Sequence, residues 1–208
     1  MKKRTALLLL LALCLTVTAA WAEIAPADTV SFYGELKGDT YENRFFGIGC
    51  SLEGWNYYTV EQMTDNDQQV REILEGKDIR PTEAEQVITV LDAALPSGIP
   101  NVNVQVQNCE RDLATYQAWG VRKVLEYLKD TFIGIFEEDF TDVQVEVGDV
   151  RIGEEDIACL HCRYDADGVR YYFKQAWLLR GNYMVRISST ALTEEEAAEV
   201  FSHFYSLQ

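Results

Sequence analysis

The stretch Asn101-Val102-Asn103-Val104-Gln105-Val106-Gln107 decides the fold class, because valine alternates strictly with a polar residue. Alternation with a period of two is typical of a strand with one buried face. Residues 82–95 begin with a helix-capping pattern but continue with the run Val87-Ile88-Thr89-Val90, whose β-branched side chains favour a strand. The Pro- and Gly-containing loop between the two segments is typical of a turn between paired strands. We therefore predict strands at 87–94 and 101–108.

A series of strands is also predicted toward the C-terminus. The segment 156–164 has an apolar face at every second residue, and Asp-Gly and Gly-Asn pairs further on are typical of tight hairpin turns. The predicted elements are, in order, a strand with alternating Val143, Val145 and Val147, a strand with Ala158, Leu160, Cys162 and Tyr164 on one face, the turn Asp165–Gly168, the strand Tyr171–Arg180, the turn Gly181-Asn182 and the strand Tyr183–Ser189.

The N-terminal part predicts two strands followed by a helix. Residues 32–36 and 45–52 are rich in strand formers and flank the turn-like residues 37–40. Thr59, with Gln62 three positions later, forms a capping-box pattern that begins a helix, and Gly76 ends it.

Two later helices are expected from apolar residues at spacings of three and four. The longer runs from about Leu113 to Glu137, with Gly120 as its weak point. The last helix begins at Thr193, with Glu196 in the capping-box position. Its predicted apolar face consists of Ala197, Val200, Phe201, Phe204 and Leu207.

The fold class that follows is α+β. Strands in hairpin series, with helices set apart from them, predict an antiparallel sheet of seven to nine strands packed with three helices. Neither a repeat nor a linker divides the sequence, so we expect one domain over residues 31–208, after a flexible lead at residues 23–30.

The first 22 residues have the pattern of a secretory signal peptide. Lys2, Lys3 and Arg4 precede an uncharged apolar run, which ends in Ala20-Trp21-Ala22 and predicts cleavage after Ala22. The alternative is an uncleaved membrane anchor, but a spanning helix needs about 20 apolar residues and this run is shorter. We expect a protein that is secreted or held at the cell-envelope exterior, with no membrane span after cleavage.

The composition excludes several classes of protein. The chain has 208 residues and a net charge of −16, and removal of residues 1–22 leaves 15 basic against 34 acidic residues, a net charge of −19. Such acidity argues against a nucleic-acid partner, which requires clustered Lys and Arg. An aromatic content of 12% excludes a disordered acidic tail.

Four cysteines remain after the expected cleavage: Cys50, Cys109, Cys159 and Cys162. Export permits disulfides, and free thiols that act as small apolar side chains are the alternative. Residues three apart in a strand are about 10 Å apart, whereas a disulfide needs Cα atoms within about 7 Å. Cys159 and Cys162 should therefore not bond each other, and any bridge would join one of them to Cys50 or Cys109.

The motif Cys159-Leu160-His161-Cys162 could form a redox or metal site. A redox C-x-x-C requires its first thiol at a helix N-terminus, where the thiol pKa falls. Here the motif lies within a predicted strand, which would place the two thiols on opposite faces. A zinc site would in addition need His203 and another cysteine. Structural cysteines are the interpretation that we favour.

Other patterns have weaker chemical meaning. Gly49-Cys50-Ser51-Leu52-Glu53-Gly54 is one residue too long for a nucleophile elbow around Ser51. Asp165, Asp167 and Gly168 resemble the start of a calcium loop, but Ala176 occupies the position of the essential Glu. We read Asp165–Gly168 as a hairpin turn.

Acidic clusters and aromatic residues in a loop are the remaining candidate binding sites. Glu194-Glu195-Glu196 fits the first turn of a helix, where the dipole favours anions, whereas Glu137-Glu138-Asp139 lies unfavourably at a helix end and could bind cations weakly. Trp55, Tyr57 and Tyr58 could form a binding patch. We favour a role for Trp55 as a plug at one end of the core.

An ordered set of short motifs suggests a family. Tyr41 and Asn43 precede a strand with Phe46-Gly47-Ile48 that ends in Gly54-Trp55. The hairpin after Pro96 follows. The C-terminal strands then pass through Tyr172, Gln175 and Tyr183–Thr190. Over roughly residues 33–208 this set resembles exported bacterial proteins with a PsbP/Mog1-like fold. The sequence departs from the pattern at Glu53, where Pro is common, and at residues 82–95, whose start is unusually polar.

The resemblance implies an α/β/α sandwich around an antiparallel sheet, and it implies no particular activity. The plant relatives are extrinsic photosystem subunits and the yeast relative binds a small GTPase, so both are binding proteins. From the residues and the resemblance together, we predict a monomeric, exported, non-enzymatic binding or accessory protein without cofactor or metal. Its partner would be a protein or a small molecule of unknown identity. The alternatives are an enzyme that uses Ser51 or Cys159, and a protein that binds cations weakly at its surface.

Overall fold

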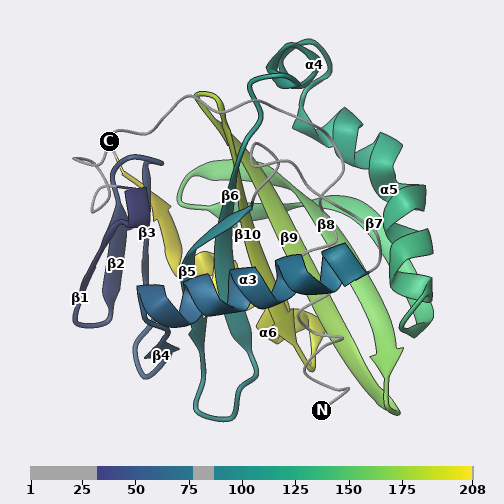
Figure 1. Cartoon of the computed structure of the whole chain (residues 1–208), viewed down its shortest axis with the longest axis horizontal. Helices are drawn as coiled ribbons and strands as arrows, with labels where there is room; N and C mark the ends of the chain where they lie inside the picture. Colours follow the sequence, from purple (N-terminus) through teal and green to yellow (C-terminus); the bar gives the residue numbers. More distant parts are fainter. Residues whose placement is uncertain (1–31, 77–86, 208) are drawn as a thin grey trace.

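The computed structural model describes residues 32–76 and 87–207. Seven antiparallel strands form the main sheet in the order β4-β5-β6-β10-β9-β8-β7, and a smaller sheet has the order β1-β2-β3-β11 (Figure 1). The main sheet comprises β4 (Asn56–Tyr57), β5 (Ile88–Ala94), β6 (Asn101–Asn108), β7 (Thr141–Ile152), β8 (Glu155–Ala166), β9 (Val169–Arg180) and β10 (Tyr183–Ala191). The smaller sheet comprises β1 (Glu35–Lys37), β2 (Thr40–Asn43), β3 (Ile48–Ser51) and β11 (Phe204–Ser206).

The hairpins that join β8, β9 and β10 are the turns that the sequence predicts. Asp167 and Gly168 connect β8 to β9 with φ angles of 53° and 78°, the left-handed conformation that a two-residue turn of this type requires. Gly181, with φ of 58°, and Asn182 connect β9 to β10. Both turns are confirmed, and they fix which side chains of the three long strands face the same way.

Helices cover both faces of the main sheet. The helix α5 (Val121–Glu137) packs on β7, β8 and β9, and the buried side chains of this layer include Leu125, Phe132 and Trp177. On the opposite face, α6 (Glu194–Ser202) and the smaller sheet share a second core with β5, β6 and β10. The helix α3 (Val60–Gly76) packs beside β5 (Figure 1). The expected α+β class and the sandwich arrangement are confirmed.

The ends of the helices follow the capping patterns in the sequence. Thr59 and Gln62 hydrogen-bond reciprocally at the start of α3, at 2.8 and 3.2 Å. At the start of α6, the Glu196 backbone N–H donates to Thr193 Oγ1 at 3.2 Å. These bonds satisfy backbone donors that the first helical turn leaves free.

The single helix expected at 113–137 is wrong. Gly120 has φ of 77° and ψ of 150°, so the chain forms α4 (Leu113–Trp119) and then α5 in a new direction. Only glycine adopts such a conformation at little cost. The part of the chain that the structure describes therefore contains the four helices α3 to α6, whereas the sequence predicts three.

The N-terminal strands and the last helix also differ from expectation. The strand predicted at 32–36 is displaced to β1, and the predicted turn at 37–40 ends where an unforeseen strand, β2, begins. The last helix ends at Ser202, and Phe204 pairs with Cys50 in β11 instead of lining a helix. Pairing with a strand more than 150 residues away is a long-range effect that local periodicity does not register.

The strands predicted at 87–94 and 101–108 are confirmed within one residue, since β5 and β6 pair as a hairpin.

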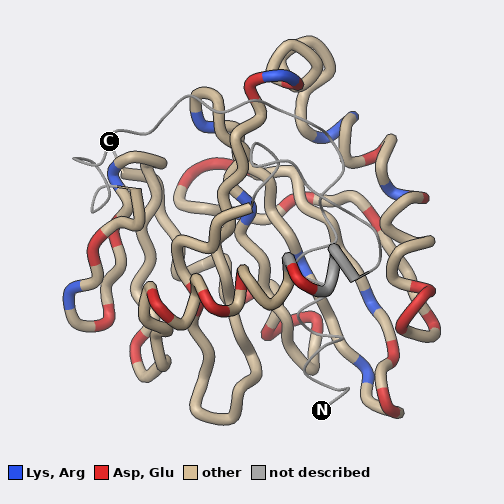
Figure 2. Tube along the Cα trace, in the orientation of Figure 1, with Lys and Arg blue, Asp and Glu red and all other residues tan. Residues whose placement is uncertain are grey.

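The signal peptide at 1–22, the lead at 23–30 and residues 82–86 lie outside the described residues. Among the helices that the structure describes, none is both long and apolar enough to cross a membrane. Acidic residues are distributed over helices, strands and turns rather than gathered on one element (Figure 2).

Candidate functional site

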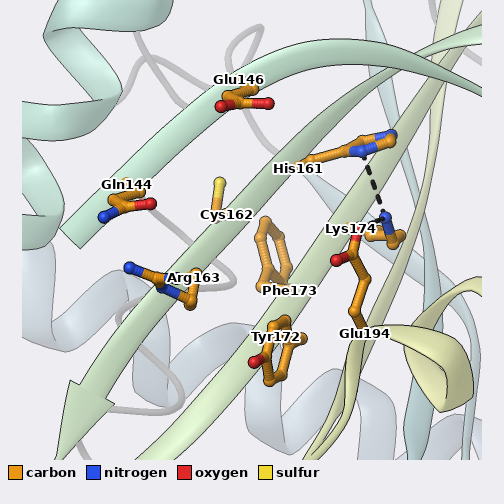
Figure 3. Close-up of a pocket in the computed structure, with 9 residues that line it drawn as sticks. All are labelled: Gln144, Glu146, His161, Cys162, Arg163, Tyr172, Phe173, Lys174 and Glu194. Atoms are coloured by element: carbon orange, nitrogen blue, oxygen red, sulfur yellow. Dashed lines mark hydrogen bonds and ion pairs between the residues drawn. The ribbon is translucent and has the colours of Figure 1, made fainter. Parts of the chain in front are cut away.

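A polar pocket of about 200 Å³ lies where the apolar face of the main sheet gives way to charged side chains. The register places Glu146 of β7, His161 of β8 and Lys174 of β9 in one row across three strands. Glu194, in the first turn of α6, reaches over this row (Figure 3). Gln144, Arg163 and Tyr172 form the next row and complete the polar lining.

Lys174 is the central group of the pocket. Its residue is only 4% exposed, which is unusual for lysine. The ammonium lies 3.1 Å from His161 Nδ1 and 3.1 Å from Glu194 Oε1 (Figure 3). A buried cation is tolerated when a carboxylate and further hydrogen bonds compensate its lost hydration, and both are present here.

His161 accepts a hydrogen bond rather than carrying a positive charge. Burial lowers the pKa of its imidazole first, and the adjacent Lys174 ammonium lowers it further, against smaller opposing effects of Glu194 and Glu146. An ammonium has no acceptor, so Lys174 donates to Nδ1 and the ring proton resides on Nε2. Nε2 is buried and has no hydrogen-bond partner.

Gly148 explains how the imidazole fits against β7. A Cβ atom at this position would lie 2.9 Å from Cε1 of His161 and 3.0 Å from its Nε2, closer than real contacts of this kind. The absence of a side chain at Gly148 therefore gives the ring its place on the sheet.

The outer end of the pocket is held by an arginine and aspartate network. Arg170 binds Asp142 at 2.6 Å and Asp165 at 2.8 Å, and Arg163 lies 3.5 Å from Asp142. Asp142 has φ of 50° at the point where the register between β7 and β8 shifts. This network orients Arg163, whose buried Nε atom has no hydrogen-bond partner.

The charges of the lining are balanced. Arg163 and Lys174 supply two positive charges, Glu146 and Glu194 supply two negative ones, and the imidazole is neutral. Because Lys174 already occupies His161 Nδ1, the imidazole is not free to take a proton from a nucleophile at that atom. The arrangement offers donors and acceptors to a polar group that enters the pocket.

The C-x-x-C motif adopts the geometry that its strand context predicts. Cys159 faces the core shared with the smaller sheet, whereas Cys162 faces α5, so the two thiols lie on opposite faces. Cys50, Cys109, Cys159 and Cys162 are all buried, and none of these four is joined to another by a disulfide. Burial raises the pKa of Cys159 to about 12, and the nearby Lys174 ammonium lowers it only in part. A thiol with this pKa is a poor nucleophile at neutral pH.

The other sequence candidates lie apart from the pocket. Ser51 ends β3 and is followed by a turn and β4, so the strand-to-helix turn of a nucleophile elbow is not formed. Asp165 binds Arg170, and Asp167 occupies the left-handed turn position. The described residues contain no group of three or more His, Cys, Asp or Glu side chains that could hold a metal ion.

The loop aromatics behave as supports of the core. Trp55 packs against the core, as expected for a plug, while Tyr57 donates to the Asp39 carbonyl at 2.8 Å and Tyr58 is exposed. Of the acidic clusters, Glu194-Glu195-Glu196 begins α6 and contributes Glu194 to the pocket, and Glu137 ends α5.

Sequence reasoning did not identify Glu146, Arg163 or Lys174 as site residues. A signal for Lys174 was present, because it interrupts the apolar strand segment Tyr171–Leu179. His161 was considered only as part of the C-x-x-C motif, and its partner lies 13 residues away on the next strand.

Comparison with known proteins gives a fold without a sequence family. Neither the models of protein families nor the curated proteins include a match to this sequence. The solution structure of cyanobacterial PsbP (CyanoP) from Synechocystis aligns with a TM-score of 0.51 at 11% identity, over 83% of this chain and 98% of that chain. The chain therefore has a PsbP-like fold, which confirms the resemblance of the sequence motifs.

Two crystal structures align less closely. LpqN, involved in cell envelope biogenesis of Mycobacterium tuberculosis, has a TM-score of 0.40 at 13% identity, over 77% of this chain and 83% of that chain. A protein from Bacteroides thetaiotaomicron has a TM-score of 0.41 at 13% identity, over 78% of this chain. The present chain spans only 46% of the length of that protein.

Proposed function

We propose that this chain is an exported binding or accessory protein that holds a ligand or partner in the Lys174 pocket without transforming it. The observation that supports the proposal is the buried Lys174 ammonium, which is held between His161 and Glu194 at 3.1 Å each. A site whose strongest groups already neutralise one another is organised to accept a polar group rather than to attack one.

The chemistry of the candidate nucleophiles supports binding over catalysis. The Cys159 thiol has a strongly raised pKa and is buried on the far side of its strand from Cys162. The Ser51 backbone N–H donates to the carbonyl of His203 at 3.2 Å, in a pairing of β3 with the end of the chain. A covalent mechanism would need one of these groups activated next to a free base.

The compartment is part of the same proposal. Residues 1–22 have the charge, apolar run and small-residue site of a signal peptide. The acidic composition of the chain is compatible with work outside the cytoplasm, in solution or at the cell envelope.

The pocket volume limits what can enter. Sites for drug-sized ligands commonly measure roughly 300–1,000 Å³, whereas this pocket has about 200 Å³. We therefore propose that the pocket accepts one polar group that is either uncharged or carries one positive and one negative charge. Such a group is a small zwitterion or the side chain and backbone of a partner.

Amide chemical shifts of the purified, isotope-labelled protein test the proposal. L-serine as a zwitterionic probe is expected to shift resonances of Gln144, Glu146 and Tyr172. Glu146→Gln should weaken the binding several-fold because one acceptor charge is lost, whereas Glu199→Gln, an exposed substitution on α6, serves as the matched control. If L-serine and the charged probes L-lysine and L-glutamate all leave these resonances unmoved, the pocket is not the binding site.

A further inference from the structure

A strip of buried polar side chains lies on the face of the main sheet opposite the Lys174 pocket. The residues of β6 and β10 alternate, so the valines of β6 face the smaller sheet while its amides face the side of α5. Eight polar residues of this face, each less than 9% exposed, make up the strip: Thr89, Asn103, Gln105, Gln107, Gln175, Arg186, Ser188 and Thr190.

Part of the strip is internally satisfied. Trp177 Nε1 donates to Gln175 Oε1 at 2.7 Å, and Gln175 Nε2 donates to Ser188 Oγ at 2.9 Å. Thr89, at the β5 end, donates two hydrogen bonds to the Asp67 carboxylate of α3, from its backbone N–H at 2.8 Å and from its hydroxyl at 2.6 Å. These groups follow the rule that buried polar atoms find partners.

Arg186, in the middle of the strip, departs from that rule. The residue is 3% exposed, its Nη2 donates to Gln107 Oε1, and its guanidinium lies 4.6 Å above the ring of Trp177. Its Nε and Nη1 atoms are buried and have no hydrogen-bond partner. Within residues 32–76 and 87–207, none of the carboxylates forms an ion pair with this guanidinium.

Asp92, an acidic side chain on this face, does not compensate the charge. Asp92 is opposite Asn103 in the pairing of β5 with β6, and Asn103 is opposite Ser188 of β10. Two strand spacings, roughly 10 Å, therefore separate the strand of Asp92 from that of Arg186. A buried charge without a counter-charge is unfavourable, because hydration is lost and little replaces it.

Two unpaired acceptors lie beside the unpaired donors. Gln105 is the direct cross-strand neighbour of Arg186, and Asn103 is diagonal to it on the same face. The Oε1 atom of Gln105 and the Oδ1 atom of Asn103 are buried and have no hydrogen-bond partner. The strip thus places one positive charge, N–H donors without a partner and two acceptors without a partner on the adjacent strands β6 and β10.

We propose that this strip, centred on Arg186, binds a monocarboxylate that also carries hydrogen-bond donors. The carboxylate compensates the guanidinium charge and takes up its free N–H groups, and the O–H or N–H groups of the ligand satisfy Gln105 and Asn103. A phosphate dianion fits less well, because it brings two charges to one cation and few donors to the two amides. The site is independent of the Lys174 pocket, since the two lie on opposite faces of the sheet.

Titration calorimetry of the purified protein tests this proposal with named probes. Glycolate represents a small hydroxy acid, and N-acetyl-glycyl-glycine represents the C-terminal carboxylate of a peptide; the amide of the same dipeptide and inorganic phosphate are the controls. We expect at least one of the two acids to bind, with at least tenfold weaker binding of the amide and of phosphate. The stronger of the two acids identifies the source of the carboxylate.

Variants at Arg186 complete the test. Arg186→Met should abolish acid binding and Arg186→Lys should weaken it at least tenfold, because a lysine keeps the charge but loses the planar fork of donors. Glu146→Gln, in the other pocket, should leave acid binding unchanged, which separates this proposal from the proposed function. Absence of heat with both acids in the wild-type protein, equal binding of phosphate, or acid binding that persists in Arg186→Met would overturn it.

Discussion

Two buried cations lie on neighbouring strands of the same sheet and have opposite surroundings. Lys174 of β9 faces α6, where Glu194 and His161 each hold its ammonium at 3.1 Å. Arg186 of β10 faces the other side, where its side chain donates to an uncharged amide, Gln107, and two of its nitrogen atoms have no hydrogen-bond partner. Both residues are less than 5% exposed.

By this difference, the Lys174 charge is a compensated part of the fold, whereas the Arg186 charge is available to a ligand. A compensated ion becomes costly when its partner is removed, because an unpaired charge then remains buried. An uncompensated buried ion already destabilises the folded state, so its removal should raise the free energy of unfolding.

The largest effect is expected at Asp92, a partly buried acid at the far end of the Arg186 strip. Burial and the neighbouring Asp67 raise its pKa from 3.8 to about 7. The folded state therefore holds a proton that the unfolded state releases above pH 4, so this group lowers stability as pH rises from about 4 to 7. Asp92→Asn should gain about 4 kcal/mol relative to wild type between pH 4 and pH 8, by the free energy of a three-unit pKa difference.

Urea unfolding of both proteins across this pH range measures the effect. A difference between Asp92→Asn and wild type that stays constant from pH 4 to pH 8 would mean that Asp92 is ionised throughout. In that case the Arg186 strip would contain an available counter-charge, and the contrast with Lys174 would weaken.

The next effect concerns the compensated cation. Glu194→Ala leaves the Lys174 ammonium buried with only His161 beside it, and we expect a loss of about 2 kcal/mol in unfolding free energy. The loss should stay below that of a fully buried pair because the Glu194 side chain is 66% exposed. Glu195→Ala in the same helical turn is the matched control, with a loss of about 0.5 kcal/mol from the helix dipole alone. Equal losses in the two variants would show that Glu194 does not compensate Lys174.

A similar loss is expected at Gly148, which gives the His161 ring its place. Gly148→Ala should cost about 2 kcal/mol through overpacking against the imidazole, and the additional substitution His161→Ala should recover most of it. Gly134→Ala is the control, because a Cβ at Gly134 meets nothing within 4 Å and alanine favours a helix by about 0.5–1 kcal/mol. A loss at Gly148 that His161→Ala does not relieve would place the strain elsewhere.

The sequence identified local features well. Alternating valines at 101–107 predicted β6, and the Asp-Gly and Gly-Asn pairs predicted both long hairpins. Thr59 and Thr193 both cap their helices as expected, and the full capping box forms at Thr59. Each of these depends on interactions between residues a few positions apart, which a single sequence displays directly.

Features that depend on distant parts of the chain were missed. The pairing of β11 with β3 joins Phe204 to Cys50, and the Gly120 break depended on the direction that α5 takes over the sheet. The same applies to the sites. Lys174 and Arg186 each interrupt an apolar strand, and this pattern is visible in the sequence. Only the folded sheet shows that Lys174 has a carboxylate partner, Glu194, whereas two nitrogen atoms of Arg186 have no hydrogen-bond partner.

The most direct test of the central contrast is the unfolding free energy of Arg186→Met, measured in urea at neutral pH without added ligand. Relief of an uncompensated buried charge should outweigh the lost hydrogen bond to Gln107 and the contact with Trp177, for a net gain of about 1 kcal/mol. The account predicts that the variant is at least as stable as wild type. A loss of about 2 kcal/mol or more, of the size expected for Glu194→Ala, would contradict it, because Arg186 would then be a structural cation like Lys174.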